Sequence, residues 1–236
     1  MKKRLCLVAL LLCFCLLPRV QAEDEKRIAL TFDDGPAGKI TARLLEELEK
    51  RQVQATFFLC CYRVTQYPDL VRQMAENGHE MGIHGCSHKY FTRMTDKELQ
   101  NEILCTQRAV EDLTGVSPML VRPPGGLYNE RVQKTARQHG LSMVLWSIDP
   151  EDWDPQKRSG AAKHVISRAK DGDIVLLHDL SRENVDAALA MVDALKRRGF
   201  SFCTVSQLAE LTQTDLSPGS IHTAFRQKRK TDSFLK

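Results

Sequence analysis

The sequence predicts an α/β fold, in which a parallel sheet is closed or nearly closed into a barrel with helices outside it. Apolar strand-like runs alternate with amphipathic helical runs along most of the chain, which is the pattern of βαβ units. The run at residues 174–177 is apolar at every position, as expected for a strand buried on both faces. A length of 236 residues, 42% hydrophobic and 27% charged, suits one globular domain and excludes disordered, fibrous and polytopic membrane proteins.

Seven apolar runs are expected to be strands, and their number favours a barrel over an open sheet. They lie at residues 28–32, 55–59, 80–83, 120–122, 142–148, 173–177 and 201–205.

Four amphipathic helices are expected between these strands. Pro68 begins one of them in the first-turn position, and Gly78 ends it. Thr95 and Glu98 form a capping box at the start of another, which ends at Gly115. Apolar stripes at helical spacing mark the first and last helices, at Ile40, Leu44, Leu45 and Leu48 and at Val185, Leu189, Val192 and Leu195.

Both ends of the chain are expected to lie outside the domain, which spans residues 23–212. Residues 1–22 predict a secretory signal peptide: three basic residues precede the uncharged run 5–17, which is too short to span a bilayer, and small residues stand at the cleavage positions. An uncleaved anchor is the alternative. Residues 217–220 break the pattern, so residues 213–236 are expected to form a basic, mobile tail.

The charge of the chain is mostly a property of its ends. Without residues 1–22, which hold four basic and no acidic residues, 30 basic and 30 acidic residues remain. A basic surface for nucleic acid is therefore not expected, nor is a membrane contact beyond the signal peptide. The basic tail is either a solvated end or a contact with anionic wall polymer or membrane. The sequence predicts no oligomeric state.

Five cysteines follow the signal peptide: Cys60, Cys61, Cys86, Cys105 and Cys203. An odd number leaves at least one thiol unpaired. The chain has no CxxC pair, so a cysteine-rich structural zinc site is not expected, and most of these residues are expected to be small buried apolar side chains. A disulfide between the adjacent Cys60 and Cys61 is sterically unfavourable.

Polar residues follow five of the predicted strands directly. The segments are Asp33-Asp34-Gly35-Pro36, His84-Gly85-Cys86-Ser87-His88, Arg122-Pro123-Pro124-Gly125-Gly126, Asp149-Pro150-Glu151-Asp152-Trp153 and His178-Asp179. Each alone has an ordinary explanation as a turn or a hydrogen-bonded core residue. Because the carboxyl ends of parallel barrel strands meet at one rim, the five together predict an active site.

The residue types at this rim predict metal-assisted hydrolysis. His84 and His88, four residues apart, are a common metal pair, and one carboxylate of Asp33 or Asp34 completes a three-ligand site with an open position. The other carboxylate is then free to act as general base on a water. His178 provides a second group that titrates near neutral pH and suits protonation of a leaving amine.

Two more side chains support these roles. Arg122 can hold a carboxylate with two hydrogen bonds. An aspartate near the second titrating group would fix its tautomer and favour its protonated form.

At these residues the sequence resembles the polysaccharide deacetylases, the NodB-homology or family 4 carbohydrate esterases. The matching motifs, in order along residues 26–180, are Thr31-Phe32-Asp33-Asp34-Gly35-Pro36, His84 with His88, Arg122-Pro123-Pro124-Gly125, Asp149 with Asp152-Trp153, and Leu176-Leu177-His178-Asp179. The resemblance implies a distorted TIM-like (β/α) barrel with parallel strands. It also implies metal-dependent removal of N- or O-acetyl groups from sugars.

The resemblance also implies a role for each matching residue. Asp34, His84 and His88 would bind the metal, usually Zn²⁺ and otherwise another divalent ion such as Co²⁺. Asp33 would be the general base and His178 the general acid.

The remaining motif residues would position these groups and the acetyl group. Arg122 would orient the base, and Asp152 would tune the acid. Trp153 and Leu176 would line the acetyl pocket, and the backbone N–H of Gly125 would help to hold the oxyanion.

Two departures from the family pattern bear on substrate preference. Gly85 stands where the family usually has Ser or Thr, with Ser87 two positions later, so a hydrogen bond behind the ligands is lost or moved. Gly125 stands where an aromatic residue is frequent, and Tyr128 is the candidate to refill that part of the pocket wall.

The predicted function is therefore that of a secreted, cell-wall-associated deacetylase of N-acetylated polysaccharide such as peptidoglycan or a chitin-like polymer, with GlcNAc of peptidoglycan as the predicted substrate. An O-acetyl xylan esterase, a muramic-acid deacetylase and a non-catalytic glycan-binding relative remain open. A non-haem iron oxygenase shares the two-His-one-carboxylate set but usually has an antiparallel double sheet.

Overall fold

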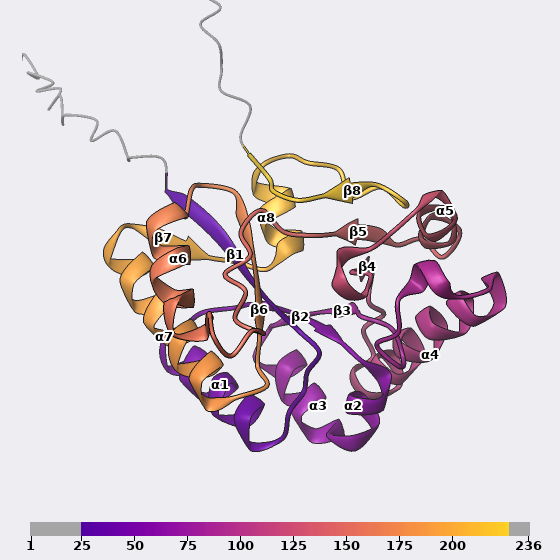
Figure 1. Cartoon of the computed structure of the whole chain (residues 1–236), viewed down its shortest axis with the longest axis horizontal. Helices are drawn as coiled ribbons and strands as arrows, with labels where there is room; N and C mark the ends of the chain where they lie inside the picture. The colour runs from indigo at the N-terminus through magenta and orange to yellow at the C-terminus, as the bar shows by residue number, and fades with distance from the viewer. Residues whose placement is uncertain (1–24, 227–236) are drawn as a thin grey trace, which may run out of the picture.

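β1 (Lys26–Asp33) is the central strand of the fold, because three other strands pair with it. It runs parallel to β2 (Thr56–Leu59), to β6 (Asp173–His178) and, through its first residues, to β7 (Phe200–Phe202). The computed structural model describes residues 25–226, and Figure 1 shows β1 crossing the middle of the molecule. The signal peptide expected at residues 1–22 lies outside the described residues.

The other strands extend the sheet from β2 and curl it into a barrel. The order is β6-β1-β2-β3-β4-β5-β8, with β3 (Glu80–Ile83), β4 (Leu120–Val121), β5 (Ser142–Val144) and β8 (Ile221–His222), and each of these ladders is parallel. Beyond β5 the chain returns to β6, where Ile148 forms a parallel bridge with Val175. This bridge joins the two sides of the curled sheet, and the predicted parallel (β/α) barrel is confirmed.

Helices cover the outside of the sheet in two groups (Figure 1). One side carries α1 (Lys39–Lys50), α6 (Ala161–Arg168) and α7 (Arg182–Arg197); the other carries α2 (Cys61–Gln66), α3 (Pro68–Glu76), α4 (Asp96–Thr114) and α5 (Glu130–Gln138). The four helices expected from the sequence are α1, α3, α4 and α7. Both hydrogen bonds of the capping box between Thr95 and Glu98 are present, and Gly115 ends α4 with a left-handed φ of 72°.

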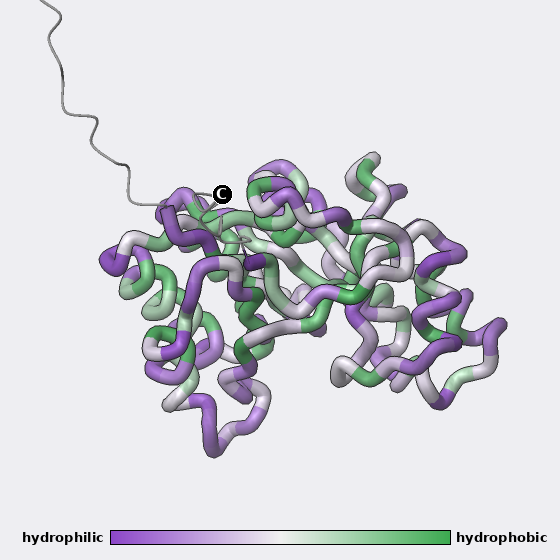
Figure 2. The backbone as a smooth tube through the Cα atoms, turned by 90° about the horizontal axis from the view of Figure 1, so that it is seen from above, coloured by the Kyte–Doolittle hydropathy of each residue, from purple (hydrophilic) through white to green (hydrophobic). Residues whose placement is uncertain are grey.

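Alternate residues of β1 face opposite sides of the sheet, as the pleat of a strand requires. Ile28, Leu30 and Phe32 are buried in the main core cluster, which includes the apolar stripes of α1 and α7. Ala29 belongs to a second cluster inside the barrel, so Asp33, four residues on, faces the interior. Burying a large apolar side chain such as Leu30 or Phe32 contributes about 1.5–3 kcal/mol to the stability of the fold. Figure 2 shows the hydrophobic stretches running through the middle of the molecule.

Two of the predicted strands end differently from expectation. The strand expected over 142–148 stops at Val144, because the carbonyl oxygens of Val144 and Leu145 accept hydrogen bonds from the Arg122 side chain at 2.9 and 2.8 Å. The strand expected over 201–205 gives way to α8 (Val205–Leu211), because Thr204 and Gln207 form a second capping box.

The domain boundary expected at residue 212 falls too early. Residues 221–222 form β8 and pair with β5, and Phe225 is buried against the second core cluster. The Arg226 guanidinium forms an ion pair with Asp173, which stands at the start of β6. Residues 213–226 are therefore part of the folded unit. The rest of the expected tail, 227–236, lies outside the described residues.

The short helices α2, α5, α6 and α8 were not expected from the sequence, since none carries a long apolar stripe. In the part of the chain that the structure describes, no helix combines the length and the apolar character needed to cross a membrane.

Candidate active site

The polar segments that follow the strands meet at one rim of the barrel and line a cavity of about 400 Å³. Its lining residues are Asp33, Asp34, His84, His88, Tyr90, Gly125, Trp146, Asp149, Trp153, Leu176 and His178. All five sequence segments are thus represented in or directly behind this wall. The parallel sheet also argues against an iron oxygenase, since that class usually has an antiparallel double sheet.

Three side chains at the cavity floor form a compact set of metal-type ligands. Asp34 Oδ1 lies 3.3 Å from His84 Nε2 and 3.0 Å from His88 Nε2, and the three ligand atoms all lie within 4.8 Å of one another. The Nδ1–H of His84 donates to the carbonyl oxygen of Arg122 at 2.7 Å, which leaves the lone pair of Nε2 facing the aspartate.

These three side chains suit a divalent cation, because they do not satisfy one another by hydrogen bonding. Asp34 Oδ1 is buried without a hydrogen-bond partner, although it lies beside two imidazoles. Burial would raise the pKa of Asp34, but the neighbouring His84 and His88 outweigh burial and hold that pKa well below its usual range. Two imidazole nitrogens and one carboxylate oxygen are the ligand set of catalytic zinc sites with an open position.

The loop that carries His88 is held by Glu102 of α4. The Glu102 carboxylate accepts hydrogen bonds from the N–H groups of Cys86 and Ser87 at 2.5 and 2.7 Å, and from the Ser87 hydroxyl at 2.7 Å. A Cβ on Gly85 would lie 2.8 Å from the Phe91 ring and 3.1 Å from Glu102, at a φ of 91°. Glycine at this position is therefore required by the packing, and Ser87 makes the polar contact behind the ligands.

Asp33 is held by a fully buried arginine. Arg122 Nη1 donates to Asp33 Oδ1 at 2.6 Å and to Thr31 Oγ1 at 2.7 Å, and its guanidinium lies 4.1 Å from the centre of the Phe58 ring. The other oxygen, Oδ2, lies 3.7 Å from His84 Nε2. Asp33 therefore presents one free oxygen toward the metal ligands. Thr31 was not expected at this site, although it precedes Asp33 by two positions and shares its face of β1.

His178 is paired with Asp152 on the opposite wall. Its Nδ1 lies 2.7 Å from Asp152 Oδ1, and its backbone N–H donates to Oδ2 at 2.9 Å. Asn184 donates to the same carboxylate at 2.8 Å. Burial would lower the pKa of His178, but the hydrogen bond and charge of Asp152 outweigh burial and raise the pKa to about 9. The pairing with Asp152 therefore favours the protonated form of His178.

The remaining wall is more aromatic than the sequence indicated. Leu176 and Trp153 line the cavity as expected, and Gly125 lines it with a φ of 64°. Tyr128 does not line it: Tyr90 covers Gly125 instead, with a ring carbon 3.1 Å from where a Cβ would stand. Trp146 and Asp149 complete the wall.

Tyr90 and Trp146 were missed because their positions gave little signal. Tyr90 follows His88 by two residues in a loop, and Trp146 lay inside a run interpreted as a strand.

Comparison with known proteins agrees with this geometry. The family model described as "Polysaccharide deacetylase" matches residues 21–144. A peptidoglycan-N-acetylglucosamine deacetylase of Bacillus cereus is 43% identical over 190 residues, which cover 78% of this chain and 89% of the relative. PgdA of Listeria monocytogenes, named with the same activity, is 40% identical over 188 residues, covering 80% of this chain but only 40% of the relative.

A solved structure shares the fold. The family 4 acetyl xylan esterase from Clostridium thermocellum, in complex with a cobalt ion, superposes with a TM-score of 0.79 at 30% identity, and covers 84% of this chain and 98% of its own. The matching family model, the identity to curated relatives and the shared barrel lead to one conclusion: this chain belongs to the polysaccharide deacetylase family.

Proposed function

We propose that the protein is an exported, metal-dependent deacetylase that hydrolyses N-acetyl groups of cell-wall glycan, with GlcNAc of peptidoglycan as its substrate. The observation that carries this proposal is the convergence, in one cavity, of a metal-type ligand set with two differently held proton-transfer groups. Asp33 is buried beside an arginine, whereas His178 is buried beside an aspartate. Such opposed environments are how active sites assign a base and an acid.

Asp34, His84 and His88 are the residues that would hold the metal. A Zn²⁺ ion, or another divalent ion such as Co²⁺, would polarise the acetyl carbonyl when bound there and lower the pKa of the attacking water. The structure of an esterase of the same fold in complex with a cobalt ion supports the choice of a divalent ion.

Asp33 is the proposed general base. Arg122 occupies Oδ1, so the proton of the attacking water is accepted at Oδ2, which faces the metal ligands. The buried guanidinium keeps the carboxylate in place before the reaction. The water oxygen then forms its bond to the acyl carbon.

His178 is the proposed general acid. Its Nδ1 is engaged by Asp152, so the proton that it delivers comes from Nε2. The C–N bond breaks as the leaving nitrogen takes this proton, and the products are acetate and the free amine of the sugar. The same proton matters less for an ester, whose leaving group is less basic.

The walls of the cavity are assigned to binding the acetyl group and the sugar. Leu176 and Trp153 would contact the acetyl methyl, and the Gly125 backbone N–H would donate to the developing oxyanion. Trp153 is 55% exposed and Tyr90 40%, so both aromatic residues at the cavity are accessible to sugar rings of a chain.

Peptidoglycan is the proposed substrate because relatives 40% and 43% identical to this chain are named for acting on it. This polymer lies outside the cytoplasmic membrane, which agrees with the signal peptide expected at residues 1–22. The acetyl xylan esterase with the same fold makes an O-acetyl polysaccharide the competing substrate.

The test compares purified peptidoglycan, N-acetylated chitin oligomers and acetyl xylan side by side, with acetate release as the first readout. Tandem mass spectrometry of muropeptides then locates each lost acetyl on GlcNAc or muramic acid. Acetate from peptidoglycan with the loss on GlcNAc is expected. Acetate from acetyl xylan alone, or loss only on muramic acid, would overturn the substrate assignment. Glycan binding with no release from any of the three would indicate a non-catalytic relative.

A further inference from the structure

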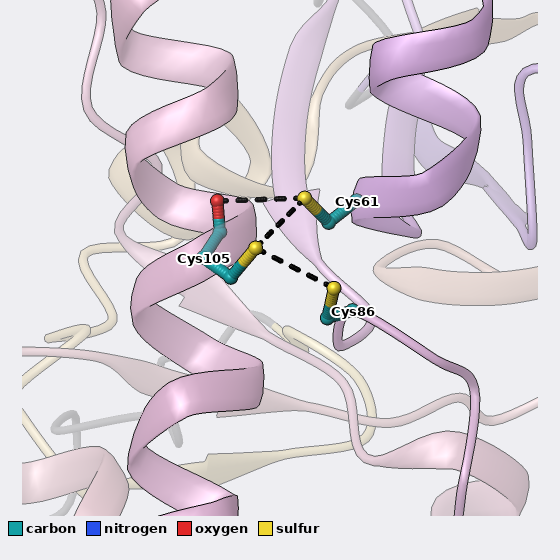
Figure 3. A group of neighbouring side chains, drawn as sticks. All are labelled: Cys61, Cys86 and Cys105. Atoms are coloured by element: carbon teal, nitrogen blue, oxygen red, sulfur yellow. Dashed lines mark hydrogen bonds between the residues drawn. The ribbon is translucent and has the colours of Figure 1, made fainter.

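Three cysteine thiols meet outside the cavity, behind the loop that carries His88. Cys61 is the first residue of α2, Cys86 lies in the loop after β3, and Cys105 lies midway along α4. The Cys105 sulfur is 3.0 Å from that of Cys61 and 3.4 Å from that of Cys86, and all three sulfurs lie within 4.8 Å of one another. Figure 3 shows the three side chains pointing toward a common centre.

The expectation that most of the five cysteines are buried is confirmed, since Cys60, Cys61 and Cys203 are buried, but it did not include the meeting of Cys61 with Cys86 and Cys105. Cys60 and Cys203 are buried apart from the cluster, as expected. The cluster escaped notice in the sequence because its members come from three separate elements, without the CxxC spacing of common zinc sites.

The spacing of the sulfurs suits a shared metal ion. Two thiolates bound to one tetrahedral zinc at about 2.3 Å stand about 3.8 Å apart. The two separations from the Cys105 sulfur, 3.0 and 3.4 Å, are shorter than this, so these sulfurs would move apart by less than about 1 Å to share an ion. A disulfide would use two of the sulfurs and leave the third unpaired, and Cys105 is nearly equally close to both partners. Three soft ligands select a thiophilic ion over Mg²⁺ or Ca²⁺.

The surroundings of the cluster also suit a cation. Cys61 is buried and Cys86 is half-buried, whereas Cys105 is exposed, so an ion can enter from the side of α4 and keep a water as fourth ligand. The carboxylate of Glu102, one turn before Cys105 on α4, bonds the Cys86 backbone N–H and adds negative charge next to the thiols.

We propose that Cys61, Cys86 and Cys105 form a second metal site, for Zn²⁺ or a similar thiophilic ion, distinct from the Asp34–His84–His88 site. An ion there ties α2 and α4 to the loop that carries His88. Backbone bonds already join α2 to this loop, from Cys61 N–H to the Gly85 carbonyl at 3.1 Å and from Tyr62 N–H to the Cys86 carbonyl at 3.4 Å. The second ion therefore steadies the loop without contacting substrate.

The experiment titrates the reduced, metal-free full chain with Co²⁺ and follows the absorbance. Thiolate ligands give cobalt an intense charge-transfer band in the near ultraviolet, which carboxylate and imidazole ligands do not give. Wild type is expected to bind two equivalents of metal and to show this band. Cys105→Ser should lose the band and one equivalent of bound metal. The variant protein is expected to fold, because residue 105 is exposed. Cys203→Ser, which changes a buried cysteine outside the cluster, should keep both.

Asp34→Asn separates this proposal from the proposed hydrolase function. That variant should lose activity and the equivalent of metal bound at the Asp34–His84–His88 site, which gives no charge-transfer band. It should retain the thiolate band of the cysteine site. A wild-type titration without the band, or a band unchanged in Cys105→Ser, would overturn the second site. So would a disulfide between any two of the three thiols in protein trapped by alkylation directly from its host, because those sulfurs would not be free to bind metal.

Discussion

The carboxylate of Asp179 occupies the space that a side chain on Gly35 would fill. A Cβ on Gly35 would lie 2.6 Å from Asp179 Oδ1 and 2.9 Å from Oδ2. Gly35 follows the candidate metal ligand Asp34, which comes directly after β1, and Asp179 follows the candidate acid His178 at the end of β6. The contact therefore fixes how the first and last polar segments meet, and it is reinforced by a hydrogen bond from the Thr41 hydroxyl to Asp179.

Gly35→Ala is expected to destabilise the protein. The added methyl collides with a fully buried carboxylate that has little room to move, a type of overpacking that costs about 1–3 kcal/mol. Chemical denaturation measures the loss. Gly160→Ala is the matched control, because a Cβ there meets nothing within 4 Å. Equal stabilities of the two variants would show that the Asp179 contact does not constrain Gly35.

Asp179 is expected to make stability depend on pH in the acid range. Burial outweighs the hydrogen bond from Thr41 and raises the pKa of Asp179 to about 6, from an ordinary value of 3.8. The folded state binds this proton more tightly than the unfolded chain. The stabilisation is therefore complete below about pH 4 and is lost as the pH rises through about 6, a change of about 3 kcal/mol.

Asp179→Asn removes this titration. The free energy of unfolding of the metal-free protein, measured at several values from pH 4 to pH 7, should fall more steeply in wild type than in the variant. Parallel curves for the two proteins would contradict the raised pKa.

Asp33→Asn is expected to keep the metal and lose activity. The base disappears, whereas the three ligand atoms of Asp34, His84 and His88 remain. Removal of an acid–base group costs about 10²–10⁴-fold in rate. Metal content and kcat are measured on the same preparation. Chelation should abolish wild-type activity and added Zn²⁺ or Co²⁺ should restore it, while neither treatment changes the inactive variant. An active Asp33→Asn protein would remove this residue from the mechanism.

Asp152→Asn is expected to move the alkaline limb of the pH–kcat profile to lower pH. A general acid works while protonated, so the rate contributed by His178 falls as the pH rises through about 9. The amide keeps most of the shape but loses the charge that raises the pKa of His178, and burial then lowers that pKa. The drop in kcat should be larger at pH 8 than at pH 6. If the alkaline limb of the pH–kcat profile did not move, a group other than His178 would determine its pKa.

The sequence by itself determined the fold class and nearly all of the candidate site. Strand–helix alternation predicts a parallel barrel, and a parallel barrel brings the carboxyl ends of its strands to one rim. Asp33, Asp34, His84, His88, Arg122 and His178 each stand at or just after a strand end, so their meeting followed from local pattern and topology alone.

The tertiary structure alone decided what packs behind and beside these residues. Tyr90 rather than Tyr128 covers Gly125, because the direction of a loop side chain depends on the path of its whole loop. Residues 213–226 return to the sheet because the burial of Phe225 and the backbone hydrogen bonds from β5 and Leu145 to Ser220 and His222 outweigh a polar, turn-rich sequence. The thiols of Cys61, Cys86 and Cys105 meet because two helices and a loop pack together. Their spacing along the chain does not predict this contact, because the three residues do not all stand at strand ends.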